Sequence, residues 1–286
     1  MDVASLLLLA IKTSILLTVF SIGLNASWQD ALSLFRNPWL LIRSVLSMNV
    51  IMPLVAAGLV VVFDLSASVK IALVALAISP VPPILPKKEL KAGGHASYAV
   101  GLLVAIALLA IVTVPVTMTW FAHAFDRTAN IEPFAVAKIV LKSVFAPLAA
   151  GIALHHLAPA LAARIARPVG LLGMVLLIAS ALPLAYASWP MFRQLFGNGT
   201  VLIVAGMAVT GLFVGHVLGG PEASDRTVLA LSTTSRHPAI AMTVAIAAGA
   251  ESKPELAAIP LYLIVALLVC IPYVAWRRGR SMAAQT

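Results

Sequence analysis

The chain has 286 residues, of which 62% are hydrophobic and 10% are charged, whereas a soluble domain carries about 25% charged residues. Too few charges remain to cover a water-facing surface, so lipid must surround most of the chain, and a soluble enzyme is excluded. The formal net charge of +9 does not indicate a nucleic-acid partner, because the basic residues stand at the ends of apolar runs rather than in one cluster.

Nine segments are long and apolar enough to cross a bilayer, for which about 20 mainly apolar residues are needed. In chain order they are approximately 3–26, 38–63, 67–92, 95–121, 133–157, 168–189, 199–219, 224–249 and 255–276. Short polar or Pro/Gly-rich turns separate them and leave no room for a soluble domain. The predicted fold class is therefore all-α, a polytopic membrane protein with about nine transmembrane helices.

The basic residues predict how the chain is oriented, because Lys and Arg of short loops collect on the cytoplasmic side. The C-terminal segment carries Arg277, Arg278 and Arg280, which places this end in the cytoplasm. Nine crossings then place the N-terminus outside. The predicted location is the plasma (inner) membrane, and the lipid bilayer is the expected surrounding.

Two of the nine segments contain a stretch that cannot form regular helix. Segment 67–92 has four prolines from Pro80 to Pro86, and each proline lacks an N–H and clashes with the preceding turn. Segment 224–249 has a polar run at 232–237 followed by Pro238. Irregular backbone at membrane depth survives only where protein or a polar cavity satisfies its polar groups. We expect broken helices near 79–87 and 232–238.

The positions of the two breaks predict an inverted repeat. The first repeat would be residues 1–125, with four helices, and the second residues 126–286, with five. Broken helices at matching positions of two halves are the best sequence indication of a transporter's binding site. Two ordinary proline kinks are the alternative, although a polar run is uncommon beside such kinks.

Several short motifs are shared with one known family. They are NPWL at 37–40, SMNVIMPL at 47–54, the Ser79-Pro80 break, KAGG at 91–94, DRT at 225–227 and SRHP at 235–238. In these motifs the chain resembles the bile acid:sodium symporter family and its bacterial relatives. The resemblance implies a panel of helices packed against a core in which two broken helices cross. Better-known members have ten helices, so this chain would be a nine-helix variant without the first.

The resemblance also implies sodium-coupled uptake of amphipathic organic anions. Sodium sites of the family use an acidic residue and a glutamine in the second broken helix, and residues 231–236 contain neither. No cofactor is expected, and a sodium ion would have only neutral ligands. The candidate ion-binding residues are Asn49, which stands where the family often has a sodium-site glutamine, with Ser232, Thr233 and Ser235.

Arg236 is the leading candidate for contact with a substrate. An ionisable side chain at bilayer depth is costly and marks function by default. A guanidinium beside a half-helix that would begin at Pro238 makes an anion site. Two other interpretations stay open: Arg236 takes the place of a bound cation, or its side chain extends to the membrane surface.

Other polar residues of the apolar segments complete the predicted site. The substrate-binding set comprises Arg236, Ser235, Thr234, Lys12 and Lys142. The hydroxyls have an alternative role in hydrogen bonding to the broken backbone, and the lysines could instead extend to the surface. Lys87 and Lys88 could line the inner mouth, although cytoplasmic charge placement explains them equally well. Histidines at 95, 216 and 237 could carry protons, but each is more often a satisfied polar residue.

The sequence lacks enzyme signatures such as HExxH, a P-loop or an acidic cluster for a metal, so no enzyme activity and no metal site are expected. The predicted function is secondary active transport of a small organic anion, with sodium or proton coupling left open. The alternative is an uncoupled or proton-coupled channel-like or regulatory membrane protein on the same fold.

Overall fold

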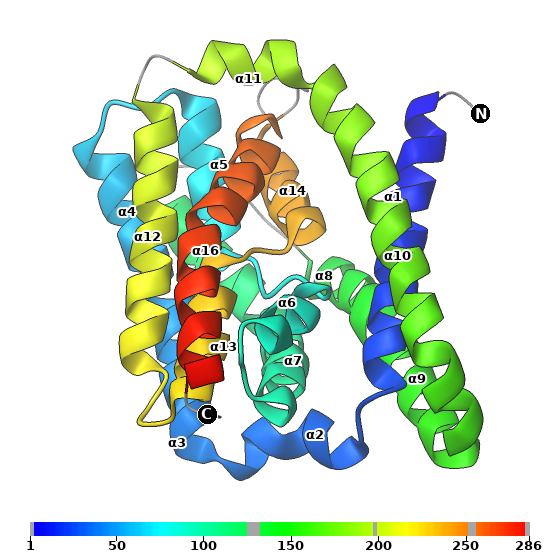
Figure 1. Cartoon of the computed structure of the whole chain (residues 1–286). Coiled ribbons are helices and arrows are strands. Elements are labelled where there is room, and N and C mark those ends of the chain that lie inside the picture. The colour runs from blue at the N-terminus through cyan, green and yellow to red at the C-terminus, as the bar shows by residue number, and fades with distance from the viewer. Residues whose placement is uncertain (1–2, 125–131, 197–198, 251–255, 284–286) are drawn as a thin grey trace.

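The computed structural model describes residues 3–124, 132–196, 199–250 and 256–283 (Figure 1). All regular structure in these ranges is helical, as the apolar pattern predicts. Seven helical spans are long and apolar enough to cross a membrane. The predicted segments 67–92 and 224–249 are each divided into two shorter helices. The count of nine crossings requires both divided segments to cross and stays a prediction.

The helices follow one another with short connections. The first part of the chain contains α1 (Val3–Gly23), α2 (Trp28–Leu32), η1 (Ser33–Arg36), α3 (Pro38–Val45), η2 (Leu46–Ile51), α4 (Met52–Val62), α5 (Ala67–Ile78), α6 (Leu85–Lys91) and α7 (Ala96–Ala124). The second part contains α8 (Pro133–Val140), η3 (Leu141–Phe145), α9 (Ala146–Leu157), α10 (Pro159–Ala187), α11 (Trp189–Leu195), α12 (Thr200–Leu218), α13 (Ala223–Thr234), α14 (Pro238–Ala247) and α16 (Ala258–Ala283). Two spans, α3–η2–α4 and α8–η3–α9, each contain a π-helical turn, a distortion frequent at functional sites.

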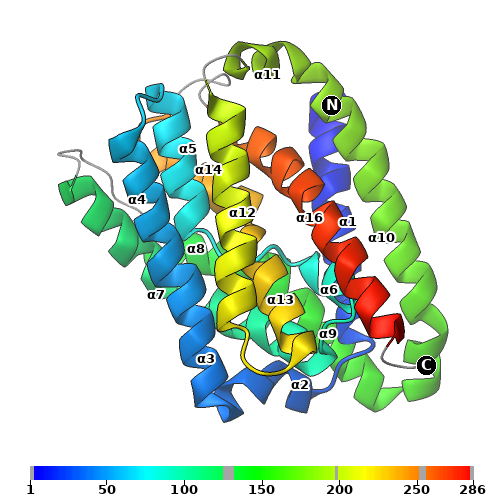
Figure 2. The ribbon, with the colours of Figure 1, turned by 60° about the vertical axis from the view of Figure 1, so that its left-hand side comes forward.

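The helices form two groups. Helices α1, α9 and α10 pack on one another and stand to one side of the molecule (Figures 1 and 2); we call them the panel. The other group, the core, contains α4 to α7, α12 to α14 and α16. Small residues allow the panel helices to approach closely: Gly23 of α1 and Gly151 of α9 face each other across their backbones.

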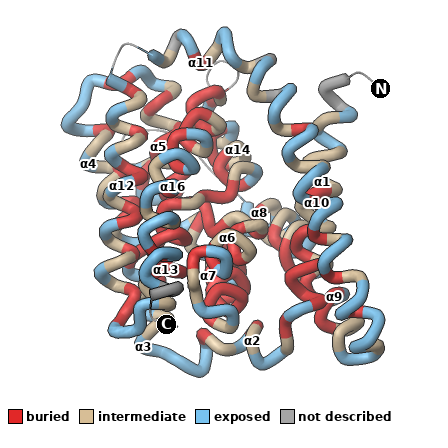
Figure 3. The backbone as a smooth tube through the Cα atoms, in the orientation of Figure 1, coloured by how far each residue is buried: buried red, intermediate tan, exposed pale blue. Residues whose placement is uncertain are grey.

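The share of buried residues differs between the central helix α7 and the peripheral helix α10. In α7, 61% of the most apolar window is buried inside the protein, against 22% in α10, and buried residues concentrate on α7 and its neighbours (Figure 3). Because α10 remains apolar while exposed, its outer surface suits lipid. Helix α1 begins at the end of the bundle opposite to that where α16 ends (Figure 1), which an odd number of crossings requires.

A short surface helix, α2, is fastened by an acidic residue outside the membrane spans. Asp30 completes a capping box with Ser27, accepting from its backbone N–H at 2.8 Å and from its hydroxyl at 2.7 Å. The Ser97 hydroxyl, at the start of α7, also donates to Asp30. Burial raises the pKa of Asp30, but these three hydrogen bonds together lower it below the usual value.

Asp30→Asn is expected to reduce the loss of stability in acid. A depressed folded-state pKa contributes stability that is present above the unfolded pKa and is lost as the pH falls through the folded one. Thermal unfolding of purified protein, followed from neutral pH down to about pH 3, should therefore show a weaker pH dependence in this variant. Asp64→Asn, at an exposed residue, is the control. Identical acid profiles for wild type and Asp30→Asn would contradict the expectation.

Candidate functional site

The two broken segments meet through their non-helical stretches. Helix α5 ends at Ile78 and α6 begins at Leu85, while α13 ends at Thr234 and α14 begins at Pro238. The backbone N–H of His237 donates to the carbonyl of Pro80 at 2.8 Å. This bond joins one break to the other, and we call the place the crossing.

The local sequence explains why the helices stop there. Prolines at 80, 82 and 83 cannot donate helical hydrogen bonds, whereas Pro86 and Pro238 stand in the first turns of α6 and α14, where the missing N–H costs nothing. The Nδ1 atom of His237 accepts from the backbone N–H of Ile240 at 3.4 Å, so His237 caps α14. Both breaks thus lie within the stretches that the sequence predicts.

Arg236 is buried at the crossing, with 1% of its surface exposed. Its Nη1 donates to the Ser79 carbonyl of the other break at 3.1 Å, so the side chain does not extend to the membrane surface. Within the described residues, Nε and Nη2 of Arg236 and Nε2 of His237 have no hydrogen-bond partner. The buried Tyr262 hydroxyl, which donates to the Thr234 carbonyl at 2.7 Å, also interacts with the guanidinium. The remaining donor capacity of Nε and Nη2 suits a negatively charged group.

The hydroxyls of α13 contact three different neighbours. Ser232 donates to the Glu89 carboxyl of α6 at 2.5 Å. Thr233 shares a hydrogen bond of 2.7 Å with Ser47 of η2, and Thr234 donates to the carbonyl of Ala208 in α12 at 3.3 Å. Ser235 is the C-cap of α13, where its backbone N–H donates to the Leu231 carbonyl, and it is half-buried. These hydroxyls hold the broken segment to its surroundings.

The proposed ion ligands make hydrogen bonds to different helices, and the Oδ1 atom of Asn49 is buried with no hydrogen-bond partner within the described residues. Asn49 lies in the π-helical turn η2 and donates from Nδ2 to the Thr113 hydroxyl of α7 at 3.0 Å. The residue of η2 that reaches α13 is instead Ser47, which contacts Thr233. Asn49 is thus bonded to a different helix from Ser232 and Thr233.

Lys12 of α1 and Lys142 of η3 lie apart from the crossing. Both side chains are exposed, and neither lines the cavity described in the next paragraph. The three histidines are also separate. His95 lies 3.1 Å from the Asp225 carboxylate, His216 is bonded to the Tyr273 hydroxyl at 2.8 Å, and His237 is the cap at the crossing.

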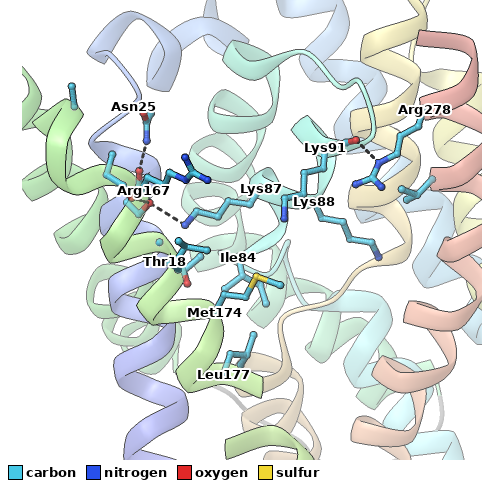
Figure 4. Close-up of a pocket in the computed structure, with 16 residues that line it drawn as sticks. Thr18, Asn25, Ile84, Lys87, Lys88, Lys91, Arg167, Met174, Leu177 and Arg278 are labelled. Atoms are coloured by element: carbon cyan, nitrogen blue, oxygen red, sulfur yellow. Dashed lines mark hydrogen bonds between the residues drawn. The ribbon is translucent and has the colours of Figure 1, made fainter. Parts of the chain in front are cut away.

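A cavity of about 560 Å³ lies between the panel and the core (Figure 4). Helices α1 and α10 form one side, and α6 and α16 the other. Five basic side chains line it: Lys87, Lys88, Lys91, Arg167 and Arg278. No acidic residue is among its lining residues as the structure describes them, so the cavity attracts anions.

Two hydrogen bonds fix the basic wall of this cavity. Lys87 donates from Nζ to the Ser21 hydroxyl of α1 at 3.0 Å, and Arg278 donates from Nε to the Lys91 carbonyl at 2.6 Å (Figure 4). Apolar residues, including Met174 and Leu177, line the same space. A cationic wall beside an apolar one suits an organic anion with a small apolar body.

Sequence reasoning anticipated Lys87 and Lys88 as lining residues but missed Glu89. This carboxyl is 1% exposed and lies on α6, next to the cavity wall. The sequence feature that could have indicated Glu89 is that it is the only acidic residue in the α6 sequence LPKKELK. In the sequence it is flanked by lysines, which indicates a surface helix, and only the packing of α6 on α13 buries it.

One comparison with known proteins gives a match. The model of the sodium bile acid symporter family matches residues 13–187, which is more than half of the chain. The matched range includes α5, α6 and the panel, but ends before α13 and Arg236. No curated protein matches the chain.

Proposed function

Because the chain belongs to the sodium bile acid symporter family, whose members are transporters rather than enzymes, we propose that it is a secondary active transporter of small organic anions. The observation that carries the proposal is the cavity between panel and core, lined by five basic and no acidic described residues. Low-dielectric walls that carry charge of one sign concentrate ligands of the opposite sign.

The proposed route runs from this cavity to the crossing. In the predicted orientation, which has the C-terminal arginines in the cytoplasm, the cavity lined by Arg278 would open to the cytoplasm, and we infer an inward-facing arrangement. The anion would first meet the lysines of α6, and the unsatisfied donors of Arg236 would hold it at the crossing. An inverted repeat, with residues 1–125 and 126–286 as its halves, would supply the alternating access by rocking of the panel against the core.

We propose that sodium contributes little to coupling. The Nδ2 atom of Asn49 is bonded to α7, while Ser232 and Thr233 are bonded to α6 and η2, so these side chains already have protein partners. A cation near Arg236 would also meet a positive charge in a low-dielectric environment, where like charges repel strongly. The candidate ligands are neutral oxygens, and the carboxyl next to them, Glu89, already accepts a hydrogen bond from Ser232.

Reversing one charge of the cavity is expected to weaken transport. Arg167→Glu replaces a lining cation by an anion and should raise the KM for an anion by roughly tenfold, about 1.4 kcal/mol, with a smaller effect at high salt. The measurement is uptake of labelled pyruvate, pantoate and methanesulfonate by proteoliposomes, as probes of three anion classes.

The matched control is Arg164→Glu. Arg164 lies one turn away on the same helix, is exposed and does not line the cavity, so its reversal should leave KM close to the wild-type value. Equal KM values for both variants would argue against the cavity as the anion route. If the wild type transports none of the probes, the proposed substrate class is wrong.

A further inference from the structure

Glu89 is buried without an ionic partner. It is 1% exposed, and its Oε1 accepts from the Ser232 hydroxyl at 2.5 Å. Its Oε2 has no hydrogen-bond partner within the described residues. The one ion pair found in the described part of the chain joins His95 and Asp225, so no cation contacts Glu89 at ion-pair distance.

The charged and titratable groups around Glu89 come from four helices. Lys88 of α6 acts on it electrostatically and lines the cavity. Tyr98 of α7 interacts with Glu89 and also with Asp225 near the start of α13. Cys270 of α16 lies next to Lys88. Glu89 thus lies near both a cation of the cavity wall and weakly acidic groups of neighbouring helices.

The surroundings of Glu89 contain one factor that stabilises its neutral form and one that stabilises its ionised form. An ionised carboxylate in an apolar interior is costly unless it is paired, which favours the neutral acid. The hydroxyl of Ser232, at a distance usual for an O–H donor to a carboxylate, favours the ionised form. The site offers too few ligands for a metal cation. Calcium and magnesium take about six or more oxygen ligands, whereas the one group hydrogen-bonded to Glu89 is the Ser232 hydroxyl.

We propose, on the basis of the proposed function, that Glu89 is the proton-binding group that couples proton movement to anion transport. The proton joins the free Oε2 of the carboxylate and yields a neutral carboxylic acid, and its release restores the carboxylate. Loss of the negative charge next to Lys88 increases the positive potential of the cavity, so the protonated form binds an anion more tightly. By reciprocity the bound anion favours protonation, so proton and anion travel together.

The same step acts on the connection between the two broken helices. The Ser232–Glu89 hydrogen bond joins α6, which carries the cavity lysines, to α13, which ends at the crossing. A hydrogen bond to an ionised acceptor is roughly twice as strong as one between neutral groups. Protonation therefore loosens the link between the cavity wall and the crossing when the anion is bound.

The first test needs no substrate. Infrared difference spectra of the purified protein, recorded while the pH is changed, should contain the carbonyl band of a protonated carboxylic acid that shifts in D₂O. Glu89→Gln should lose this band, while Glu222→Gln, at an exposed residue of the same chain, should keep it. Ser232→Ala should retain the band but move its titration to higher pH, since the carboxylate loses its donor. Identical spectra for wild type and Glu89→Gln would overturn the proposal.

The second test measures coupling in proteoliposomes with pyruvate, pantoate and methanesulfonate. An inside-alkaline pH gradient should drive accumulation by the wild type and by Glu222→Gln, and the uptake rate should vary with pH. Glu89→Gln should lose the gradient-driven accumulation, and its remaining uptake should not respond to pH. Accumulation driven by sodium alone would overturn proton coupling and leave the transporter function intact. If no anion is transported at all, the proposed function fails, and the infrared result still decides whether Glu89 binds a proton.

Discussion

Arg236→Ala is expected to abolish anion accumulation and to weaken anion binding by roughly 10- to 100-fold. Nε and Nη2 of this buried guanidinium have no hydrogen-bond partner within the described residues, and a hydrogen bond to a charged group contributes about 1.5–3 kcal/mol. Affinity would be measured by thermal shift of the purified protein with pyruvate, pantoate and methanesulfonate, and transport by uptake into proteoliposomes.

The same substitution is expected to lower the stability. Nη1 of Arg236 donates to the Ser79 carbonyl, and a buried acceptor that loses its donor costs about 1–3 kcal/mol. Arg236→Lys keeps a positive charge near Ser79 but lacks the planar fork of donors, so it should recover part of the stability and little of the anion affinity.

The variants also distinguish the two candidate roles of Arg236, which are contact with the substrate and replacement of a bound cation. Sodium that restores the stability of Arg236→Ala would show that the guanidinium replaces a bound cation at the crossing. Lost anion binding without rescue by sodium would show substrate contact. Arg164→Ala, at an exposed residue of α10, is the control for loss of positive charge. Wild-type stability and transport in Arg236→Ala would contradict both roles.

Gly215→Val is expected to destabilise the core and to inactivate transport. A Cβ at Gly215 of α12 would collide with the backbone of Leu229 and Ala230 in α13. Because these are backbone atoms, α13 must move as a whole, and it carries the hydroxyls that hold the crossing. Overpacking of a well-packed interior costs about 1–3 kcal/mol.

Gly206→Val on the same helix is the matched control. A Cβ there would meet nothing within 4 Å, so both variants share the effects of a β-branched residue within α12 and differ in the collision alone. The midpoint of thermal unfolding in detergent and the uptake of the three anions should fall in Gly215→Val and stay near wild type in Gly206→Val. Equal losses in the two variants would mean that the α12–α13 contact does not limit stability.

The sequence alone determined the features that depend on local chemistry. Single prolines at 115, 168, 183 and 272 lie inside helices, but four prolines within seven positions, or a proline after a polar run, favour a break. The breaks could therefore be located within a few residues from the prolines at 80–86 and from the polar run before Pro238. The low share of charged residues determined the lipid environment, and the cost of a buried guanidinium singled out Arg236. The family followed from short motifs, and the match over residues 13–187 establishes it. The inverted repeat stays a prediction.

Only the tertiary structure decided which side chains meet. Glu89 and Ser232 are 143 positions apart, and no local pattern indicates that α6 packs on α13 and buries a carboxyl flanked by lysines. Asn49 and Ser47 lie on the same π-helical turn, yet Ser47 is hydrogen-bonded to α13 and Asn49 to α7, because residues two positions apart point to different faces of a helix. Lys12 and Lys142 are basic residues in apolar segments, which predicts anion binding, but both side chains are exposed. Partners are set by how distant helices pack, and that packing depends on the shape of the whole bundle rather than on the residues beside each side chain.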